Sequence, residues 1–464
     1  MATEVRLTAE WVAAAMAGQM VAAGSGRVEF SGVSIDTRTL RAGELYVGIR
    51  GDRFDGAEFS AAAVEAGAAG IVVPRGREHA VRTGDAVAPV VIVVDDTTVA
   101  LQALAHAARM ASGTKVVAIT GSAGKTTTKE VTAEFLGAKY RVIRNRGNLN
   151  NHIGLPLSLM ELTAGPDVAV VELGMNHAGE ISTLVRLAEP DVRVWTNVGE
   201  AHLGFFASVD AIADAKAEIL EGATAGSLLV ANADDDLVAS RTARFAGRVV
   251  TFGIDRAADV RATRVVDRGI DGTTAHVTTP RGSFNLETPL IGRGNLANIL
   301  AATAVGVHFD VPLDDMAARA ATLTPAHHRG DVLRLGRGVI VIDDSYNANP
   351  TATRRAIDVL TVSRPAGRRV AVIGEMLELG DHGEALHRGV GEAAARAEVD
   401  QLVAIAVAAV MAGLPKERAH YFATSADAAN AFAAYVAEGD LVLVKGSRGV
   451  RTDLVVDRLK AEFA

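Results

Sequence analysis

The chain has 464 residues, more than one hydrophobic core usually holds, so we expect two to four domains. Lys and Arg total 47 against 55 Asp and Glu, and no basic stripe is present, so the composition argues against a nucleic-acid binder. The absence of cysteine excludes disulfides, thiolate metal sites and a cysteine nucleophile, and it fits a cytoplasmic protein.

No segment of the sequence is expected to enter a membrane. The longest uncharged apolar run, residues 402–414, has 13 residues. That length is too short to span a bilayer, and it predicts a buried strand passing into a helix. Residues 1–11 contain no basic stretch followed by an apolar one, so we expect no secretory signal.

The chain predicts three α/β domains in succession. Residues 1–112 contain short alternating segments and an alanine-rich helix, which predict a small domain with a mixed sheet. Residues 113–322 predict a central, mostly parallel domain, because buried strands such as KVVAIT and DVAVVELG alternate with helices. A polar stretch at 261–282 predicts antiparallel strands attached to it. Residues 323–464 repeat the strand–helix rhythm in a dinucleotide-fold type of domain without the glycine fingerprint.

The stretch AITGSAGKTTTKE, residues 118–130, joins a predicted buried strand to a predicted helix and is similar to a phosphate-binding loop. Its glycines would let backbone N–H groups converge on phosphate oxygens at the helix N-terminus. Lys125 would neutralise the terminal phosphates, and Thr126 would offer its hydroxyl to Mg²⁺. The alternative is a plain strand-to-helix turn. The residues expected to bind nucleotide here are Gly121, Ser122, Ala123, Gly124, Lys125, Thr126 and Thr127.

Three further predicted strands end in polar groups, at the edge where ligand sites of α/β sheets collect. Carboxylate oxygens at such positions are ligands that Mg²⁺ prefers. Each segment alone can also be a strand end whose Asp or Asn caps the next helix. The residues are Glu172, then Asn197, Glu200 and His202, and finally Asp343, Asp344, Tyr346 and Asn349.

Lys216 lies on the apolar stripe of a predicted helix that includes Ile212 and Ile219. Spacing alone favours a lysine at the edge of the stripe, with its ammonium reaching water. The alternative is a buried amine with a lowered pKa and a chemical task.

These motifs resemble the Mur ligases of bacterial cell-wall synthesis, whose phosphate loop has the short form G-x-x-G-K-T-T. The resemblance covers nearly the whole chain. It rests on DTR, GDRFDG, GNLNNHIGLPLSL, GSAGKTT, ELGMNHAGEI, NVGEAHLGFF, AKAEIL, DDSYNANP, GEMLELG and VKGSRG.

The resemblance implies an N-terminal UDP-substrate domain, a central P-loop-type ATPase domain and a C-terminal Rossmann-like domain that binds the incoming amine. DDSYNANP, ELGMN and VKGSR are similar to the family member that joins D-alanyl-D-alanine to UDP-N-acetylmuramoyl-tripeptide through an acyl phosphate. The implied cofactors are ATP, two Mg²⁺ ions and a carbamylated Lys216, and the implied state is a cytoplasmic monomer.

The resemblance also implies individual roles. The catalytic residues are Lys125, Glu172, His202 and Lys216, and the metal ligands are Thr126, Glu172, His202 and Lys216. Nucleotide contacts beyond the loop are Asn295, Arg329 and Asp344. Substrate contacts are Asp36, Thr37, Arg38, Asn148, Asn151, Asn349, Lys445, Ser447 and Arg448.

Three positions depart from the family pattern. Gly294 stands where a histidine is usual, although the adjacent Asn295 is kept. His328 precedes Arg329 where a glycine is common, and Ala57 stands where histidine is frequent. Two other functions stay open: a related ligase that adds a single amino acid or glutamate, and a P-loop protein that uses ATP only as a switch.

Overall fold

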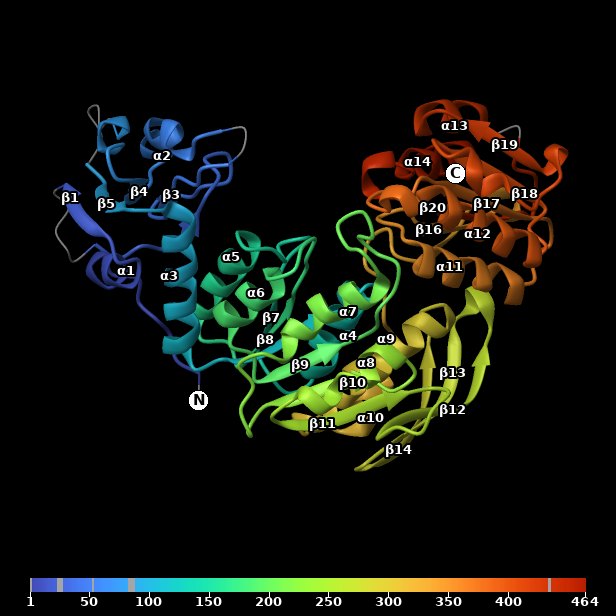
Figure 1. Ribbon diagram of the computed structural model, residues 1–464, viewed down its shortest axis with the longest axis horizontal. Coiled ribbons are helices and arrows are strands. Elements are labelled where there is room, and N and C mark those ends of the chain that lie inside the picture. Colours follow the sequence, from blue (N-terminus) through green and yellow to red (C-terminus); the bar gives the residue numbers. More distant parts are fainter. Residues whose placement is uncertain (1, 23–27, 52–53, 82–87, 433–434) are drawn as a thin grey trace. The chain divides into compact units, whose positions relative to one another are not determined.

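The computed structural model describes residues 2–22, 28–51, 54–81, 88–432 and 435–464 (Figure 1). The chain forms two compact units. The first comprises Met1–Ala118, Tyr140–Met175 and Gly179–Asp191, and the second comprises Ile119–Lys139, Asn176–Ala178 and Val192–Ala464. The division falls within one strand, β6 (Lys115–Thr120), so each unit contains part of it.

The first unit begins with a five-stranded mixed sheet. Its order is β1-β5-β4-β3-β2, in which β1 runs antiparallel to β5 and the other neighbours are parallel, as predicted for this region. The unit also contains the order β6-β8-β7, with β7 and β8 parallel. The elements are α1 (Ala9–Ala15), β1 (Gln19–Ala22), β2 (Val33–Ser34), β3 (Leu45–Val47), α2 (Ser60–Glu65), β4 (Gly70–Pro74), β5 (Val90–Val94), α3 (Thr97–Ser112), β7 (Val142–Arg144), α5 (Gly154–Met160), β8 (Val168–Glu172) and α6 (Glu180–Ala188).

The second unit contains a sheet in the order β14-β13-β12-β11-β10-β9-β6. The pairs β9–β10, β10–β11 and β11–β12 are parallel, whereas β12–β13 and β13–β14 are antiparallel and confirm the expected insertion. The elements are α4 (Lys125–Leu136), β9 (Val192–Trp195), α7 (Val209–Ala217), β10 (Leu228–Asn232), α8 (Asp236–Ala239), β11 (Arg248–Gly253), β12 (Val260–Asp267), β13 (Thr273–Thr279), β14 (Gly282–Thr288), α9 (Gly292–His308) and α10 (Leu313–Ala320).

A six-stranded sheet follows in the same unit, in the order β15-β16-β20-β17-β18-β19. Only β15 is antiparallel to its neighbour. The elements are β15 (Asp331–Arg334), β16 (Ile340–Asp344), α11 (Pro350–Val362), β17 (Arg369–Gly374), α12 (Gly383–Arg396), β18 (Gln401–Ile405), β19 (Ala419–Phe422), α13 (Ser425–Ala431), β20 (Leu441–Lys445) and α14 (Asp453–Glu462).

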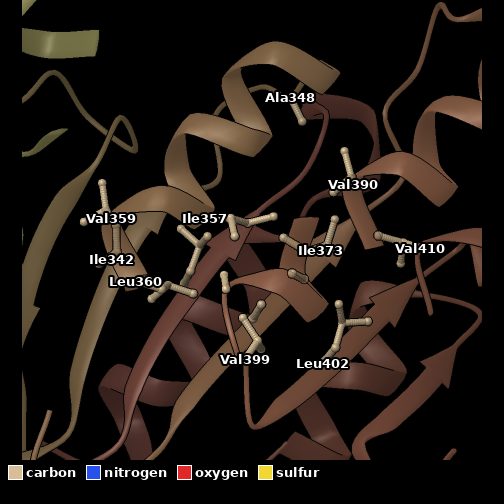
Figure 2. Packing of buried hydrophobic residues seen from close by; sticks show 14 of the residues in the cluster. Ile342, Ala348, Ile357, Val359, Leu360, Ile373, Val390, Val399, Leu402 and Val410 are labelled. Atoms are coloured by element: carbon tan, nitrogen blue, oxygen red, sulfur yellow. The ribbon is translucent and has the colours of Figure 1, made fainter. Parts of the chain in front are cut away.

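Helices cover both faces of this last sheet (Figure 1). One buried cluster lies between the sheet and helices α11 and α12, and a second lies between the sheet and helices α13 and α14. Figure 2 shows part of the first cluster, with Ile357 of α11 and Val390 of α12 beside Ile373 of β17. Because strands β16, β17, β18 and β20 are parallel, their carboxyl ends share one edge of the sheet.

The apolar run at 402–414 is a buried strand, β18, followed by a short 3-10 helix at Ala408–Met411, as the sequence predicted. Over the described ranges, no helix combines the length and apolar character needed to cross a bilayer.

Candidate active site

The phosphate loop lies between the end of β6 and the start of α4. Gly121 has φ +150°, and a Cβ there would lie 1.9 Å from the hydroxyl of Thr196, so only glycine fits. Lys125, Thr126 and Thr127 form the first turn of α4, where helical N–H groups lack intrahelical acceptors. The Lys125 ammonium donates to the carbonyl of Gly121 at 2.8 Å. The turn therefore has the geometry of an anion-binding helix N-terminus.

The segment after β9 holds this loop in place. The Asn197 side chain accepts from the backbone N–H of Ala123 and donates to its carbonyl, both at 2.9 Å. The N–H of Ser122 donates to the carbonyl of Asn197 at 3.0 Å, and the Ser122 hydroxyl accepts from Gly199 N–H at 3.0 Å. Asn197 is buried, so it acts as a fixed brace for the loop.

Helix α9 supports the loop from another side. Gly124 has φ +81°, and a Cβ there would lie 2.3 Å from Oδ1 of Asn298. That oxygen accepts from the Thr128 hydroxyl at 3.2 Å, and Asn298 Nδ2 donates to Oδ1 of Asn295 at 3.2 Å. Asn295, expected to contact nucleotide, is thus connected to the phosphate loop through one side chain.

The structure corrects the expectation that the ammonium of Lys216 reaches water. Lys216 is 1% exposed on α7. Burial lowers the pKa of Lys216 well below its ordinary value, and the positive charge of Lys125 lowers it further. The guanidinium of the buried Arg193 donates to the carbonyls of Ile219 at 2.9 Å and Glu221 at 3.2 Å, just beyond α7. These bonds fix the end of the helix that carries Lys216.

His202 is oriented by a residue to which the sequence analysis gave no role. Its Nδ1 lies 2.5 Å from a carboxylate oxygen of Glu378, in the motif GEMLELG. The N–H of Gly204 donates to the carbonyl of Glu378 at 2.8 Å. Metal-binding histidines commonly have such a carboxylate partner on the second ring nitrogen. The motif GEMLELG is the only sequence signal that points to Glu378, because its partner His202 lies 176 residues away in the chain.

Asp344 and Lys445 meet at the carboxyl ends of β16 and β20. The two residues are register partners on these parallel strands. The Lys445 ammonium lies 2.5 Å from Oδ2 of Asp344 and donates to the carbonyl of Asn347 at 3.0 Å. The nearby Ser447 hydroxyl accepts from the N–H of Leu377 at 2.9 Å.

Tyr346 lies beside two of the predicted contact residues. The guanidinium carbon of Arg329 is 4.2 Å from the centre of the Tyr346 ring, and that of Arg448 is 4.9 Å from it. Such cation–π contacts orient both guanidinium groups. Asn349 caps α11 by accepting from Ala352 N–H at 2.8 Å.

A cavity of about 960 Å³ is lined by residues that follow β17 and β18 and by residues of α12, and Leu377, which donates to Ser447, is one of its lining residues. His387 borders it and is structural: its Nε2 accepts from Met376 N–H at 2.8 Å, and Nδ1 donates to the Gly383 carbonyl at 2.6 Å. Burial lowers the pKa of His387, so the ring is held neutral. The charged residues that line the cavity are Glu375, Glu378, Glu384, Arg388 and Lys416.

Glu172 belongs to the first unit, at the end of β8. It is buried, accepts from Asn150 Nδ2 at 2.9 Å, and its backbone N–H donates to Asn145 Oδ1 at 2.9 Å. Neither asparagine was predicted from the sequence: Asn150 lies within the motif GNLNNHIGLPLSL, whereas Asn145 lies two residues before it. Asn151, expected to bind substrate, accepts at 2.8 Å from the N–H of Gly154, the first residue of α5, while Asn148 is exposed.

Asp36, Thr37 and Arg38 form a tight turn in the first unit. The Arg38 guanidinium contacts both Asp36 oxygens, with its Nε 2.9 Å from Oδ1. This side-chain bond and the Arg38 backbone N–H lower the pKa of Asp36 to about 2. Both side chains reach solvent and can be presented to a ligand.

The three departures have local explanations. A Cβ at Gly294 would lie 3.6 Å from Cδ of Arg355 on α11, so an arginine side chain lies beside this position. His328 adopts φ +58°, and its Nδ1 is 2.6 Å from Oδ2 of the buried Asp343. Ala57 is fully buried in a 3-10 helix; residues 52–53 of the neighbouring GDRFDG lie outside the described residues.

The candidate metal ligands do not form a conventional cluster of acidic and histidine side chains. Among the residues that the structure describes, no three His, Cys, Asp or Glu side chains gather into a preformed cluster. The expected set differs, since it includes the Thr126 hydroxyl and a modified Lys216. The buried, weakly basic Lys216 amine and the carboxylate-oriented His202 fit that set.

Three family profiles match the chain: Mur ligase family, catalytic domain, over residues 29–109; Mur ligase middle domain over 119–306; and Mur ligase, glutamate ligase domain, over 328–448. A Bacillus subtilis (strain 168) protein named UDP-N-acetylmuramoyl-tripeptide–D-alanyl-D-alanine ligase is 35% identical over 439 residues, which cover 92% of this chain and 93% of that protein.

Solved structures agree. MurF from Acinetobacter baumannii superposes with a TM-score of 0.88 at 30% identity, covering 99% of both chains. MurF ligase from Thermotoga maritima, solved in complex with ADP, gives a TM-score of 0.81 at 29% identity and covers 93% of this chain and 97% of that one. The chain therefore belongs to the Mur ligase family. Within the family its similarity is to MurF, which confirms the resemblance and the three-domain α/β fold.

Proposed function

We propose that the chain is an ATP-dependent ligase that joins D-alanyl-D-alanine to UDP-N-acetylmuramoyl-tripeptide, giving UDP-N-acetylmuramoyl-pentapeptide, ADP and phosphate. The short phosphate loop, braced by Asn197 with Lys125 at its helix N-terminus, carries the proposal. Similarity to the Bacillus subtilis ligase over nearly the full chain supports the choice of substrates. The product is a peptidoglycan precursor.

The reaction has two steps. A carboxylate oxygen of the tripeptide attacks the γ-phosphorus of ATP, so that the bond to the β–γ bridging oxygen breaks and ADP leaves. The dipeptide amine then attacks the acyl carbon, and a tetrahedral intermediate expels phosphate as the amine loses a proton. In the first step, the negatively charged carboxylate must approach the negatively charged γ-phosphate, and the two repel each other. Lys125 and the N-terminal N–H groups of α4 neutralise the phosphate and hold it in line.

Mg²⁺ would neutralise charge on the β- and γ-phosphates. We assign Thr126, Glu172, His202 and Lys216 to hold two such ions. Lys216 fits this role as a carbamate: its neutral amine adds to CO2 with loss of a proton, and the product presents anionic oxygen donors. Burial and the neighbouring Lys125 favour the neutral amine that this addition requires.

The remaining assignments follow the three proposed domains, residues 1–112, 113–322 and 323–464. The turn and asparagines of the first unit bind the UDP-tripeptide: Asp36, Thr37, Arg38, Asn148 and Asn151. Nucleotide contacts are the loop residues with Asn295, Arg329 and Asp344. The dipeptide side is formed by Asn349, Lys445, Ser447 and Arg448. The ligase acts as a monomer in the cytoplasm, where its nucleotide substrates are found.

Phosphate release tests the proposal. Release should require both a UDP-muramoyl-tripeptide and D-alanyl-D-alanine, and tripeptides with lysine or diaminopimelate at the third position define the natural substrate. A faster reaction with a single amino acid or glutamate would assign the chain to a related ligase. ATP hydrolysis that is independent of any amine would instead support an ATP-driven switch.

A further inference from the structure

A ring of hydrogen bonds connects the phosphate loop to the N-terminus of α11. The Ser122 hydroxyl donates to the carbonyl of Gly199 at 3.2 Å, and the next residue is Glu200. The Thr351 hydroxyl, in the first turn of α11, donates to Glu200 Oε2 at 2.7 Å. Asn349, which caps the helix, donates from Nδ2 to the carbonyl of Ser122 at 3.3 Å and closes the ring.

An ion pair strengthens the same contact. Arg354 Nη2 lies 2.7 Å from Oε1 and 2.5 Å from Oε2 of Glu200. The side chains of Arg354 and Glu200 are 34% and 25% exposed, so solvent screens the pair only in part. Burial opposes ionisation of Glu200, but hydrogen bonds from Thr351 and Arg354 outweigh it and lower the pKa of Glu200.

The backbone approach at this contact is close. A Cβ at Gly199 would lie 2.6 Å from the Thr351 hydroxyl, so the backbone of the segment after β9 packs directly against the Thr351 side chain of α11. Movement of one element must therefore move the other or break the contact.

The segment that leads into α11 contacts the proposed dipeptide side. The segment that leads into α11 contains Asp344, paired with Lys445, and Asn347, whose carbonyl accepts from Lys445. Displacement of the α11 N-terminus would shift these groups relative to one another. The phosphate loop and the carboxyl edge of the last sheet are thus connected through one helix.

We propose that Glu200 is a positioning residue, which through Arg354 and Thr351 holds the N-terminus of α11 against the phosphate loop. Nucleotide at the loop then orders the site where the amine arrives. Glu200 touches neither reacting atoms nor substrate in this role. The inference rests on the proposed binding of ATP at the loop and adds the residues that couple that binding to the second step.

Three variants and one control test the coupling. Glu200→Gln removes the charge, Arg354→Gln removes its partner, and Thr351→Val removes only a hydroxyl. Glu462→Gln is the control, since it deletes the carboxylate of an equally simple ion pair, 2.7 Å from Arg458 on α14. Each variant is assayed for ligation, and a double-mutant cycle combines Glu200→Gln with Arg354→Gln.

We expect Glu200→Gln to lower kcat/KM for D-alanyl-D-alanine at least tenfold, with KM for ATP changed less than twofold. The double variant should be no worse than the poorer single variant, and Thr351→Val should show a smaller loss in the same parameter. Melting temperatures should match that of the control. A kcat/KM for the dipeptide within twofold of wild type, or losses that multiply in the double variant, would overturn the proposal.

Hydrogen exchange separates this inference from the proposed function. ADP should slow amide exchange in residues 350–362 of the wild type but not of Glu200→Gln, whatever the amine substrate is. A wild type that binds no ADP contradicts the proposed function itself. ADP binding with equal protection of α11 in both proteins contradicts the coupling alone.

Discussion

Replacing Gly124 by alanine should damage the phosphate loop more than its backbone conformation alone explains. Gly124 precedes α4 with φ +81° and ψ −4°. Gly179 precedes α6 with a nearly identical φ of +86° and ψ of −14°, but a Cβ there would meet nothing within 4 Å. Gly179→Ala is therefore a matched control, which measures the left-handed strain without a steric clash.

The magnitude follows from the contacts. Left-handed strain costs alanine about 1–2 kcal/mol at either position. At position 124 the new Cβ lies 2.3 Å from Asn298 Oδ1, so the Asn298 side chain must move. Its bonds with Thr128 and Asn295 are then lost, at roughly 1 kcal/mol each. The free energy of unfolding should fall by about 3–4 kcal/mol in Gly124→Ala and by about 1–2 kcal/mol in Gly179→Ala.

Urea unfolding followed by the fluorescence of Trp195, buried in β9, measures the free energy of unfolding. Isothermal titration calorimetry measures the affinity for ADP. We expect at least a tenfold loss of ADP affinity in Gly124→Ala and a loss below twofold in Gly179→Ala. Equal unfolding free energies and equal ADP affinities in the two variants would refute the reasoning about Asn298.

Three further outcomes are expected. Lys125→Ala should abolish turnover while circular dichroism and the melting temperature stay near wild type, because a partly exposed loop lysine contributes little packing; ligation at a normal rate would end the phosphate-loop interpretation. Lys216→Ala should lose most activity and regain part of it with a short added carboxylate that replaces the missing carbamate, whereas a near-normal rate without addition would exclude carbamylation. The folded-state pKa of His387 is lowered, so its contribution to stability is complete above about pH 6.5 and falls by up to about 1.4 kcal/mol per pH unit below it. Denaturant unfolding at pH 7.5 and 5.5 should show this loss of stability in the wild type. An equal loss in His387→Asn would assign the pH dependence to another group.

The sequence predicted elements well where the signal is local. Buried strands followed by glycine, lysine and threonine identify the phosphate loop, because strand, turn and helix start are contiguous. The antiparallel insertion near 261–282 was also evident, since alternating polar and apolar residues are read directly from the chain.

Long-range partners were not predictable from a single sequence. Glu378 lies 176 residues from His202, and Arg354 lies 154 residues from Glu200, and no local pattern links either pair. The burial of Lys216 was misjudged for a related reason. Helical spacing shows that a lysine lies on an apolar face, but only the packing of α7 decides whether the ammonium reaches water.

Transfer of oxygen from substrate to phosphate tests the central proposal most directly. The UDP-muramoyl-tripeptide, labelled with ¹⁸O at both oxygens of its terminal carboxylate, is incubated with ATP and D-alanyl-D-alanine. The masses of the released phosphate and of the UDP-peptide are then measured by mass spectrometry. Ligation through an acyl phosphate places one ¹⁸O atom in each phosphate released and adds the dipeptide to the UDP-peptide. Phosphate without label, or an unextended UDP-peptide, would contradict the account.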